Sequence, residues 1–128
     1  MFTSSNRKSA LLVTKNPAER DLLKLALHRI GYHVQTADHA YQVMEKVEHS
    51  KPDLLVLDLF LSQTNGLEML KQIEDSVSLK SMYVIAMTAM AFPEVVEQAK
   101  VAGANDILLK PFSTDLLVQK ARRLQTVV

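Results

Sequence analysis

The 128-residue sequence contains no cysteine. This absence excludes disulfide bonds, thiolate nucleophiles and zinc sites with cysteine ligands, and it fits a reducing cytoplasm, which we take as the expected location. The four histidines are scattered and none forms an H-x-x-x-H pair, so we do not expect a metal site built on histidine. No apolar run reaches the roughly 18 residues of a membrane span, so we expect no membrane association.

An excess of charge of one sign is also lacking. Fifteen Lys and Arg residues face fourteen Asp and Glu residues, which gives a net charge of +1. This balance provides no electrostatic basis for direct nucleic-acid binding. Length and composition fit one globular domain. We expect a flexible N-terminal tail over residues 1–8 and a single domain over residues 9–126.

Short apolar segments alternate with amphipathic segments five times along the chain. The expected strands span residues 10–14, 33–36, 53–59, 82–87 and 106–109, and the expected helices span residues 17–30, 37–49, 67–75, 91–102 and 113–124. The segment over residues 60–66 is expected to be a loop. Continuous apolar strands with intervening helices predict an α/β fold, in which a five-stranded parallel sheet is covered by five helices in three layers.

Polar side chains stand where several of these strands end. Thr14 and Lys15 lie at the end of the first strand, Asp58 lies at the end of the third, Thr88 follows the fourth and Lys110 follows the fifth. The carboxyl ends of parallel strands meet at one edge of a sheet, so we expect these groups to converge. Each residue alone is more often a cap, a turn or a surface charge. Together, a carboxylate, a hydroxyl and an ammonium group predict a site that holds a phosphoryl group or forms an aspartyl phosphate.

Three segments carry a resemblance to the receiver domain of two-component response regulators, which extends over residues 10–124. They are PDLLVLDLFLSQTNGLEML (52–70), VIAMTA (84–89) and AGANDILLKPF (102–112). Asp58 matches the phosphoacceptor of the family, Thr88 the hydroxyl residue that senses the phosphoryl group, and Lys110 the charge-stabilising lysine. Gly66 matches the glycine eight residues after the acceptor, and the peptide bond before the matching Pro111 is often cis in the family.

The resemblance implies a flavodoxin-like (βα)5 fold and a signalling module rather than an enzyme. It implies that a histidine kinase or phosphotransferase donates the phosphoryl group. Phosphorylation would then shift the population of a surface formed by the fourth helix, fifth strand and fifth helix, which contacts an output domain or partner protein. The cluster of Lys120, Arg122 and Arg123 on the last helix is interpreted as a solvated face near a helix C-terminus, and the alternative is a surface that faces an acidic partner or an output domain.

The main departure from the family lies directly after the first strand. The family has two acidic residues there, which bind Mg²⁺, whereas this sequence has Thr14 and Lys15. Mg²⁺ prefers charged oxygen ligands, and a lysine ammonium repels it. Only the Asp58 carboxylate and the Phe60 backbone carbonyl remain as expected ligands. The sequence therefore predicts weak Mg²⁺ binding. One hypothesis is that the Lys15 ammonium replaces the metal and pairs with Asp58, and the alternative is that Lys15 is a surface lysine.

Two further departures are Ile107, where many members have a switching Tyr or Phe, and Ser62, where a proline is common. Ile107 has no hydroxyl group, so it cannot act as a tyrosine-like switch. A change in its packing would signal phosphorylation in a different way. Two functions remain in competition. The first is a phosphoacceptor with weakened or altered Mg²⁺ dependence, and the second is a phosphorylation-independent pseudo-receiver that binds proteins. A nucleotide- or flavin-binding domain is disfavoured, because the loop over residues 14–17 has no phosphate-binding glycine.

Overall fold

The computed structural model describes residues 8–61, 64–76, 81–90 and 92–126. Residues 1–7, which form most of the expected tail, and Ser62 lie outside the described residues. Within the described part of the chain, no helix is both long and apolar enough to cross a membrane.

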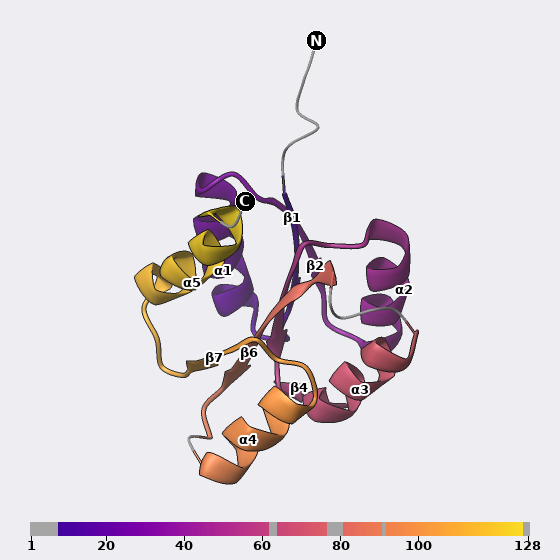
Figure 1. Ribbon diagram of the computed structural model, residues 1–128. Coiled ribbons are helices and arrows are strands. Elements are labelled where there is room, and N and C mark those ends of the chain that lie inside the picture. Colours follow the sequence, from indigo (N-terminus) through magenta and orange to yellow (C-terminus); the bar gives the residue numbers. More distant parts are fainter. Residues whose placement is uncertain (1–7, 62–63, 77–80, 91, 127–128) are drawn as a thin grey trace.

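Five parallel strands form the central sheet (Figure 1). They are β1 (Ser9–Val13), β2 (His33–Ala37), β3 (Leu54–Asp58), β6 (Tyr83–Thr88) and β7 (Asp106–Leu109), in the spatial order β2-β1-β3-β6-β7. The central strand β3 is buried along its whole length, as expected for an apolar strand that is covered on both faces. The expected parallel α/β architecture is therefore confirmed.

The five expected helices cover the two faces of this sheet. They are α1 (Pro17–Arg29), α2 (Ala40–Ser50), α3 (Gly66–Ser76), α4 (Pro93–Val101) and α5 (Thr114–Thr126). One core lies between the sheet and α1 and α5, and it contains Leu23, Leu27, Leu117 and Ala121. The other core lies between the sheet and α2, α3 and α4, and it contains Val43, Val47, Leu70, Ile73 and Ala99. Successive strand residues alternate between the two cores, which makes the three layers seen in Figure 1.

Two helices begin later than the sequence pattern predicts. The helix expected from residue 37 begins at Ala40, because Ala37 still pairs with Val13 in the sheet. The helix expected from residue 91 begins at Pro93, which occupies a position in the first helical turn that suits proline, and Phe92 before it is extended.

The segment after β3 is more ordered than the expected loop. β4 (Phe60–Leu61) and β5 (Thr64–Asn65) pair as antiparallel strands. The Gly66 N–H then donates to the Leu59 carbonyl at 2.9 Å. A Cβ atom at Gly66 would lie 2.6 Å from the Leu59 Cα, so only glycine permits this close approach. The chain is thereby folded back over the end of β3, next to Asp58.

Candidate phosphoacceptor site

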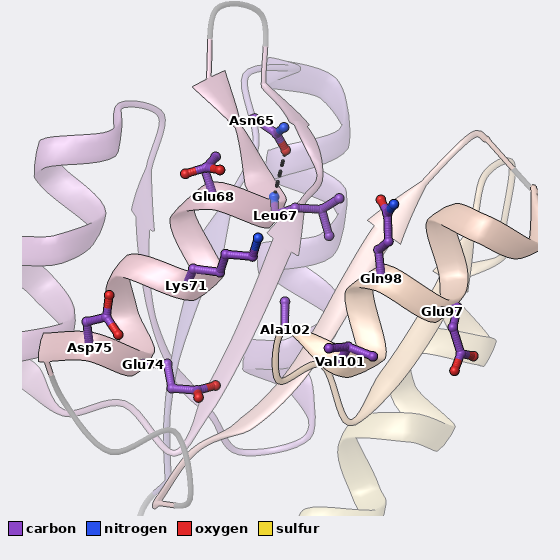
Figure 2. Close-up of a pocket in the computed structure, with 10 residues that line it drawn as sticks. All are labelled: Asn65, Leu67, Glu68, Lys71, Glu74, Asp75, Glu97, Gln98, Val101 and Ala102. Atoms are coloured by element: carbon purple, nitrogen blue, oxygen red, sulfur yellow. Dashed lines mark hydrogen bonds between the residues drawn. The ribbon is translucent and has the colours of Figure 1, made fainter.

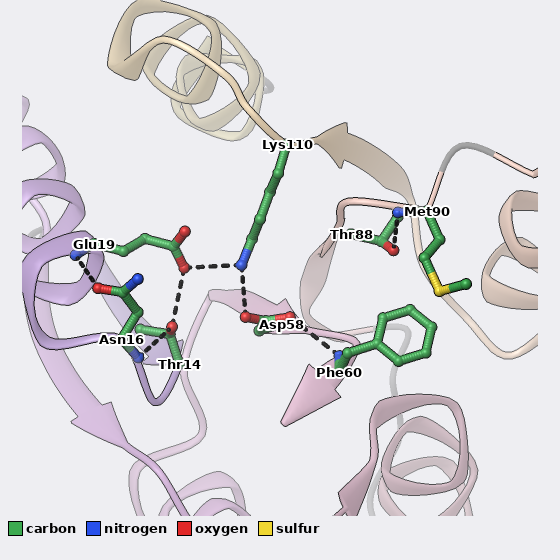
Figure 3. A network of polar contacts seen from close by, with 8 residues as sticks. All are labelled: Thr14, Asn16, Glu19, Asp58, Phe60, Thr88, Met90 and Lys110. Atoms are coloured by element: carbon green, nitrogen blue, oxygen red, sulfur yellow. Dashed lines mark hydrogen bonds and ion pairs between the residues drawn. The ribbon is translucent and has the colours of Figure 1, made fainter. Parts of the chain in front are cut away.

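Asp58 is the last residue of the central strand and is 9% exposed. Both of its carboxylate oxygens have partners (Figure 3). Oδ1 accepts a hydrogen bond from the Phe60 N–H at 3.1 Å, and Oδ2 accepts one from the Lys110 ammonium at 2.6 Å. The ammonium and the carboxylate therefore form a charge-assisted hydrogen bond at the carboxyl edge of the sheet.

Lys110 reaches Asp58 from the residue directly after β7. Its backbone N–H donates to the Thr88 carbonyl at 2.8 Å, and its peptide bond to Pro111 is cis. The hydrogen bond to Thr88 holds the backbone beside the neighbouring strand β6, and the Lys110 side chain extends from there across the edge of the sheet. The side chain is 21% exposed, so the ion pair is shielded from water only in part.

Glu19 is a second carboxylate on the same ammonium. Its Oε1 lies 3.1 Å from the Lys110 Nζ and also accepts a hydrogen bond from the Thr14 hydroxyl at 3.0 Å. Burial alone would lower the pKa of Lys110, but its hydrogen bonds to Asp58 and Glu19 outweigh burial and raise that pKa above its ordinary value. Lys110 therefore stays charged at neutral pH.

The start of α1 explains the position of Glu19. Asn16 caps the helix, because its Oδ1 accepts the Glu19 N–H at 3.0 Å, and the Asn16 N–H donates to the Thr14 Oγ1 at 3.2 Å. The sequence analysis missed Glu19 as a site residue. The available signal was the spacing of Asn16 and Glu19, which matches the N-cap and third residue of a capped helix. That spacing predicts an acidic side chain in the first turn, close to the end of β1.

Thr88 ends β6, beside Asp58, and is fully buried. Its Oγ1 accepts the Met90 N–H at 3.0 Å, and among the described residues no hydrogen bond joins it to Asp58. The hydroxyl therefore lies at the same edge as the Asp58–Lys110 pair but is engaged with its own loop (Figure 3).

Thr14 and Lys15 occupy the positions of the family's acidic pair. Thr14 is 2% exposed and belongs to the Glu19 network, whereas Lys15 is exposed. The described ion pair of Asp58 is with Lys110, and a pairing of Lys15 with Asp58 stays a hypothesis.

Ile107 lies within β7 and is half-buried against the core that contains α4. Its N–H donates to the Asp106 carboxylate at 2.9 Å, so its backbone is held at the start of the strand. The side chain supplies apolar packing at the position where the resemblance places a switching aromatic ring.

The resemblance implies a bound Mg²⁺, whose ligands would have to come from the oxygen atoms at this site. The described residues contain no group of three or more His, Cys, Asp or Glu side chains that could hold a metal ion. Thr14 carries no charge, and the Glu19 and Asp58 carboxylates already share the Lys110 ammonium. Mg²⁺ requires several oxygen ligands in a near-octahedral arrangement. These residues do not fit a tightly held divalent cation.

Two hollows differ in their relation to this site. One of about 280 Å³ opens beside it, and Glu19, Lys110 and Phe112 are among its lining residues. The other, of about 620 Å³, lies between α3 and α4 and shares no lining residue with the Asp58 network (Figure 2). Its charged lining residues are Glu68, Lys71, Glu74, Asp75 and Glu97. The smaller hollow therefore reaches the site on the side of Glu19 and Lys110, and Asp58 does not line it.

A doubly covered parallel sheet with an aspartate–lysine pair at its carboxyl edge defines a receiver-type signalling module. Comparison with known families agrees with this class. The model of the response regulator receiver domain matches residues 10–122, and the chain belongs to this family. The expected family and flavodoxin-like fold are thereby confirmed.

Individual relatives place the chain within two-component signalling. It is 34% identical over 116 residues to the transcriptional regulatory protein TrcR of Mycobacterium tuberculosis, which covers 89% of this chain and 44% of that protein. It is 26% identical to the polar-differentiation response regulator DivK of Brucella anthropi, over 88% of this chain and 91% of that protein. Among solved structures, the chemotaxis response regulator CheY4 of Vibrio cholerae superimposes with a TM-score of 0.85 at 24% identity, covering 93% of this chain and 99% of that chain. The chain spans only about half of the length of the transcriptional regulators that it matches.

Proposed function

We propose that Asp58 accepts a phosphoryl group from a histidine kinase or phosphotransferase, and that this modification controls an output domain or partner protein. The observation that carries the proposal is the contact of 2.6 Å between the Asp58 carboxylate and the Lys110 ammonium at the carboxyl edge of the sheet. An ionised carboxylate is the nucleophile that forms an aspartyl phosphate, and a fixed ammonium neutralises charge on the phosphoryl oxygens.

The transfer is a simple displacement at phosphorus. One carboxylate oxygen of Asp58 forms a bond to phosphorus while the bond between phosphorus and the donor atom breaks. The donor atom, an imidazole nitrogen or the oxygen of an acyl phosphate, leaves with the electron pair. Lys110 donates a hydrogen bond to a phosphoryl oxygen, as expected for a reaction that depends on positioning and charge stabilisation. The chain is then the acceptor of the group and not an enzyme that turns over a substrate.

We also propose that Mg²⁺ binds weakly and contributes less than it does in a site with two acidic residues. Support comes from the uncharged Thr14, the exposed Lys15, and the engagement of Glu19 and Asp58 with Lys110. In this reading, the ammonium supplies the positive charge beside the acceptor.

The proposed readout surface is formed by α4, β7 and α5. Support comes from exposed apolar side chains on and beside these elements, which include Phe92, Val101, Leu109 and Leu116. An apolar surface of this kind suits a protein partner. The balanced charge of the chain gives no support to direct nucleic-acid binding by this domain, and we place its action in the cytoplasm.

One alternative is a pseudo-receiver that binds a partner without being phosphorylated. It is favoured by the same network, because both Asp58 oxygens are occupied and Lys110 is shared with Glu19. The phosphoacceptor and the pseudo-receiver differ in one observable property, which is whether Asp58 takes up a phosphoryl group.

Incubation with acetyl phosphate, with and without Mg²⁺, followed by intact-mass measurement, tests the proposal. We expect an adduct of one phosphoryl group in the native protein, with little dependence on Mg²⁺. The adduct should be lost in Asp58→Asn and kept in Asp75→Asn, which removes one carboxylate from the distant α3–α4 hollow. Failure of the folded native protein to form an adduct, when an ordinary receiver does so in parallel, would support the pseudo-receiver.

A further inference from the structure

The Lys110 ammonium is shared between carboxylates from two different elements. Asp58 approaches it from the end of β3 at 2.6 Å, and Glu19 approaches it from the first turn of α1 at 3.1 Å. An ammonium group has three N–H donors, so two of them are directed at carboxylate oxygens. The position of Lys110 in this state is therefore set by Glu19 as well as by Asp58.

Glu19 is held in place without help from Asp58. Its Oε1 accepts the Thr14 hydroxyl at 3.0 Å, and its backbone N–H is capped by the Asn16 Oδ1 at 3.0 Å (Figure 3). The Glu19 side chain is only 19% exposed, which limits the screening of its charge by water. A change in the charge of Asp58 would therefore leave the Glu19 carboxylate where it is.

A phosphoryl group on Asp58 would change the hydrogen-bond partners of the Lys110 ammonium. It adds anionic oxygens next to the ammonium, and each of them is a strong acceptor. Lys110 is the cation that forms an ion pair with Asp58 among the described residues. Glu19 holds the same ammonium and, as a like charge, opposes a second anion beside it. Glu19 and the phosphoryl group therefore compete for Lys110.

We propose that Glu19 is a latch, a positioning residue that holds the Lys110 ammonium in the unphosphorylated arrangement and competes with the phosphoryl group for it. This inference rests on the proposed function of Asp58. The second negative charge beside Lys110 then comes from Glu19 in α1. The end of β1 supplies no negative charge, because Thr14 and Lys15 stand there. Removal of the Glu19 charge should favour the phosphorylated state.

The test compares Glu19→Gln with Asp21→Asn. The glutamine keeps a carbonyl oxygen that can accept from Thr14 and Lys110, but it removes the negative charge. Asp21 lies on the same helix, is 71% exposed and pairs with Arg20, so its change to asparagine removes one charge outside the network. Both variants and the native protein are incubated with acetyl phosphate at one fixed Mg²⁺ concentration, and the phosphorylated fraction is read from the intact mass.

We expect the ratio of phosphorylated to free protein to rise about fivefold or more in Glu19→Gln, and to stay within about twofold of the native value in Asp21→Asn. A second readout is the concentration of beryllofluoride, a non-covalent phosphoryl mimic, that half-saturates the amide NMR shifts around Asp58. This concentration should fall by a similar factor in Glu19→Gln.

The outcomes separate the latch from the proposed function. A native protein that forms the adduct, with an unchanged or lower ratio in Glu19→Gln, would overturn the latch alone. Equal rises in the two variants would also overturn it, because they would reflect overall charge. An adduct in Glu19→Gln only would be the strongest form of the latch. No adduct in any of the three proteins would overturn the proposed function and the latch with it.

Discussion

Asp58 lies at the end of its strand and Asp106 at the beginning of its strand, and the ratio of acidic to basic groups around them is opposite. Asp58 ends β3, and its ion cluster places one cation, Lys110, between two carboxylates. Asp106 begins β7, and its cluster places one carboxylate between two cations, Lys120 at 2.8 Å and Arg123 at 3.0 Å. Both carboxylates are mostly shielded, with 12% and 16% of the side chain exposed.

The difference shows that similar aspartate–lysine contacts can have a structural role in one place and belong to a candidate functional site in another. At Asp106 the carboxylate is saturated, since one of its oxygens also accepts the Ile107 N–H, and the cluster ties α5 to β7. At Asp58 the acids outnumber the cation, and the cluster lies at the carboxyl edge where α/β proteins place their functional groups. A newly attached anion changes the balance at Asp58, because the Lys110 ammonium already pairs with two carboxylates.

The largest effect expected from this comparison is on phosphoryl uptake by lysine variants. Lys110→Met should lower the rate of adduct formation by about tenfold or more, because it removes the donor that neutralises the phosphoryl oxygens. Lys120→Met removes the matching ammonium at Asp106 and should leave the rate within about twofold. The measurement is the time course of the intact mass with acetyl phosphate. Equal losses in two folded variants would show that the ammonium at Asp58 has no special role.

A smaller effect is expected on the stability of the α5 anchor. Asp106→Ala leaves the mostly buried Lys120 ammonium unpaired and should lower the free energy of unfolding by about 2 kcal/mol. Arg123→Ala should cost less than about 0.5 kcal/mol, because the Arg123 side chain is 64% exposed and its ion pair is screened. Urea unfolding measures both values. A cost for Arg123→Ala as large as that for Asp106→Ala would contradict the view that the ion pair of the buried Lys120 provides most of the stabilisation.

Sequence patterns were sufficient for the fold because the apolar strands are long and continuous. LLVLD over residues 54–58 has no polar residue before Asp58, and such a segment suits only a strand that is covered on both faces. Helix starts were predicted less well. The structure ends β2 at Ala37 and begins α2 at Ala40, and the tertiary pairing of Ala37 with Val13 decides that boundary.

The site was predictable only in the part that depends on strand ends. Asp58, Thr88 and Lys110 follow strands, so topology alone brings them to one edge. Glu19 reaches the site from within a helix, and its role depends on which way its side chain turns from the Asn16 cap. For Lys15, charge complementarity left two alternatives open, a pair with Asp58 or a surface position, and the structure shows this residue exposed.

Helix α5 is also held by a neutral hydrogen bond, which can be compared with the ion pairs of Asp106. The buried Tyr32 hydroxyl donates to the Ala121 carbonyl at 2.9 Å. Tyr32→Phe should lower the free energy of unfolding by about 1 kcal/mol at neutral pH, because it removes this buried hydrogen bond. Urea unfolding at pH 7 measures this effect.

The same variant should alter the response to alkaline pH. Burial, with a smaller contribution from the negative charge of Asp53, raises the pKa of Tyr32 from its ordinary value of 10.0 to about 12. The folded state therefore favours the neutral phenol, and this stabilisation is complete below pH 10 and is lost as the pH rises towards 12. The loss amounts to about 2–3 kcal/mol. Because every other titrating group is common to both proteins, the difference in unfolding free energy between native protein and Tyr32→Phe should shrink above pH 10 and then change sign. A difference that stays constant from pH 7 to pH 12 would show that the phenol ionises as readily in the folded chain as in the unfolded one.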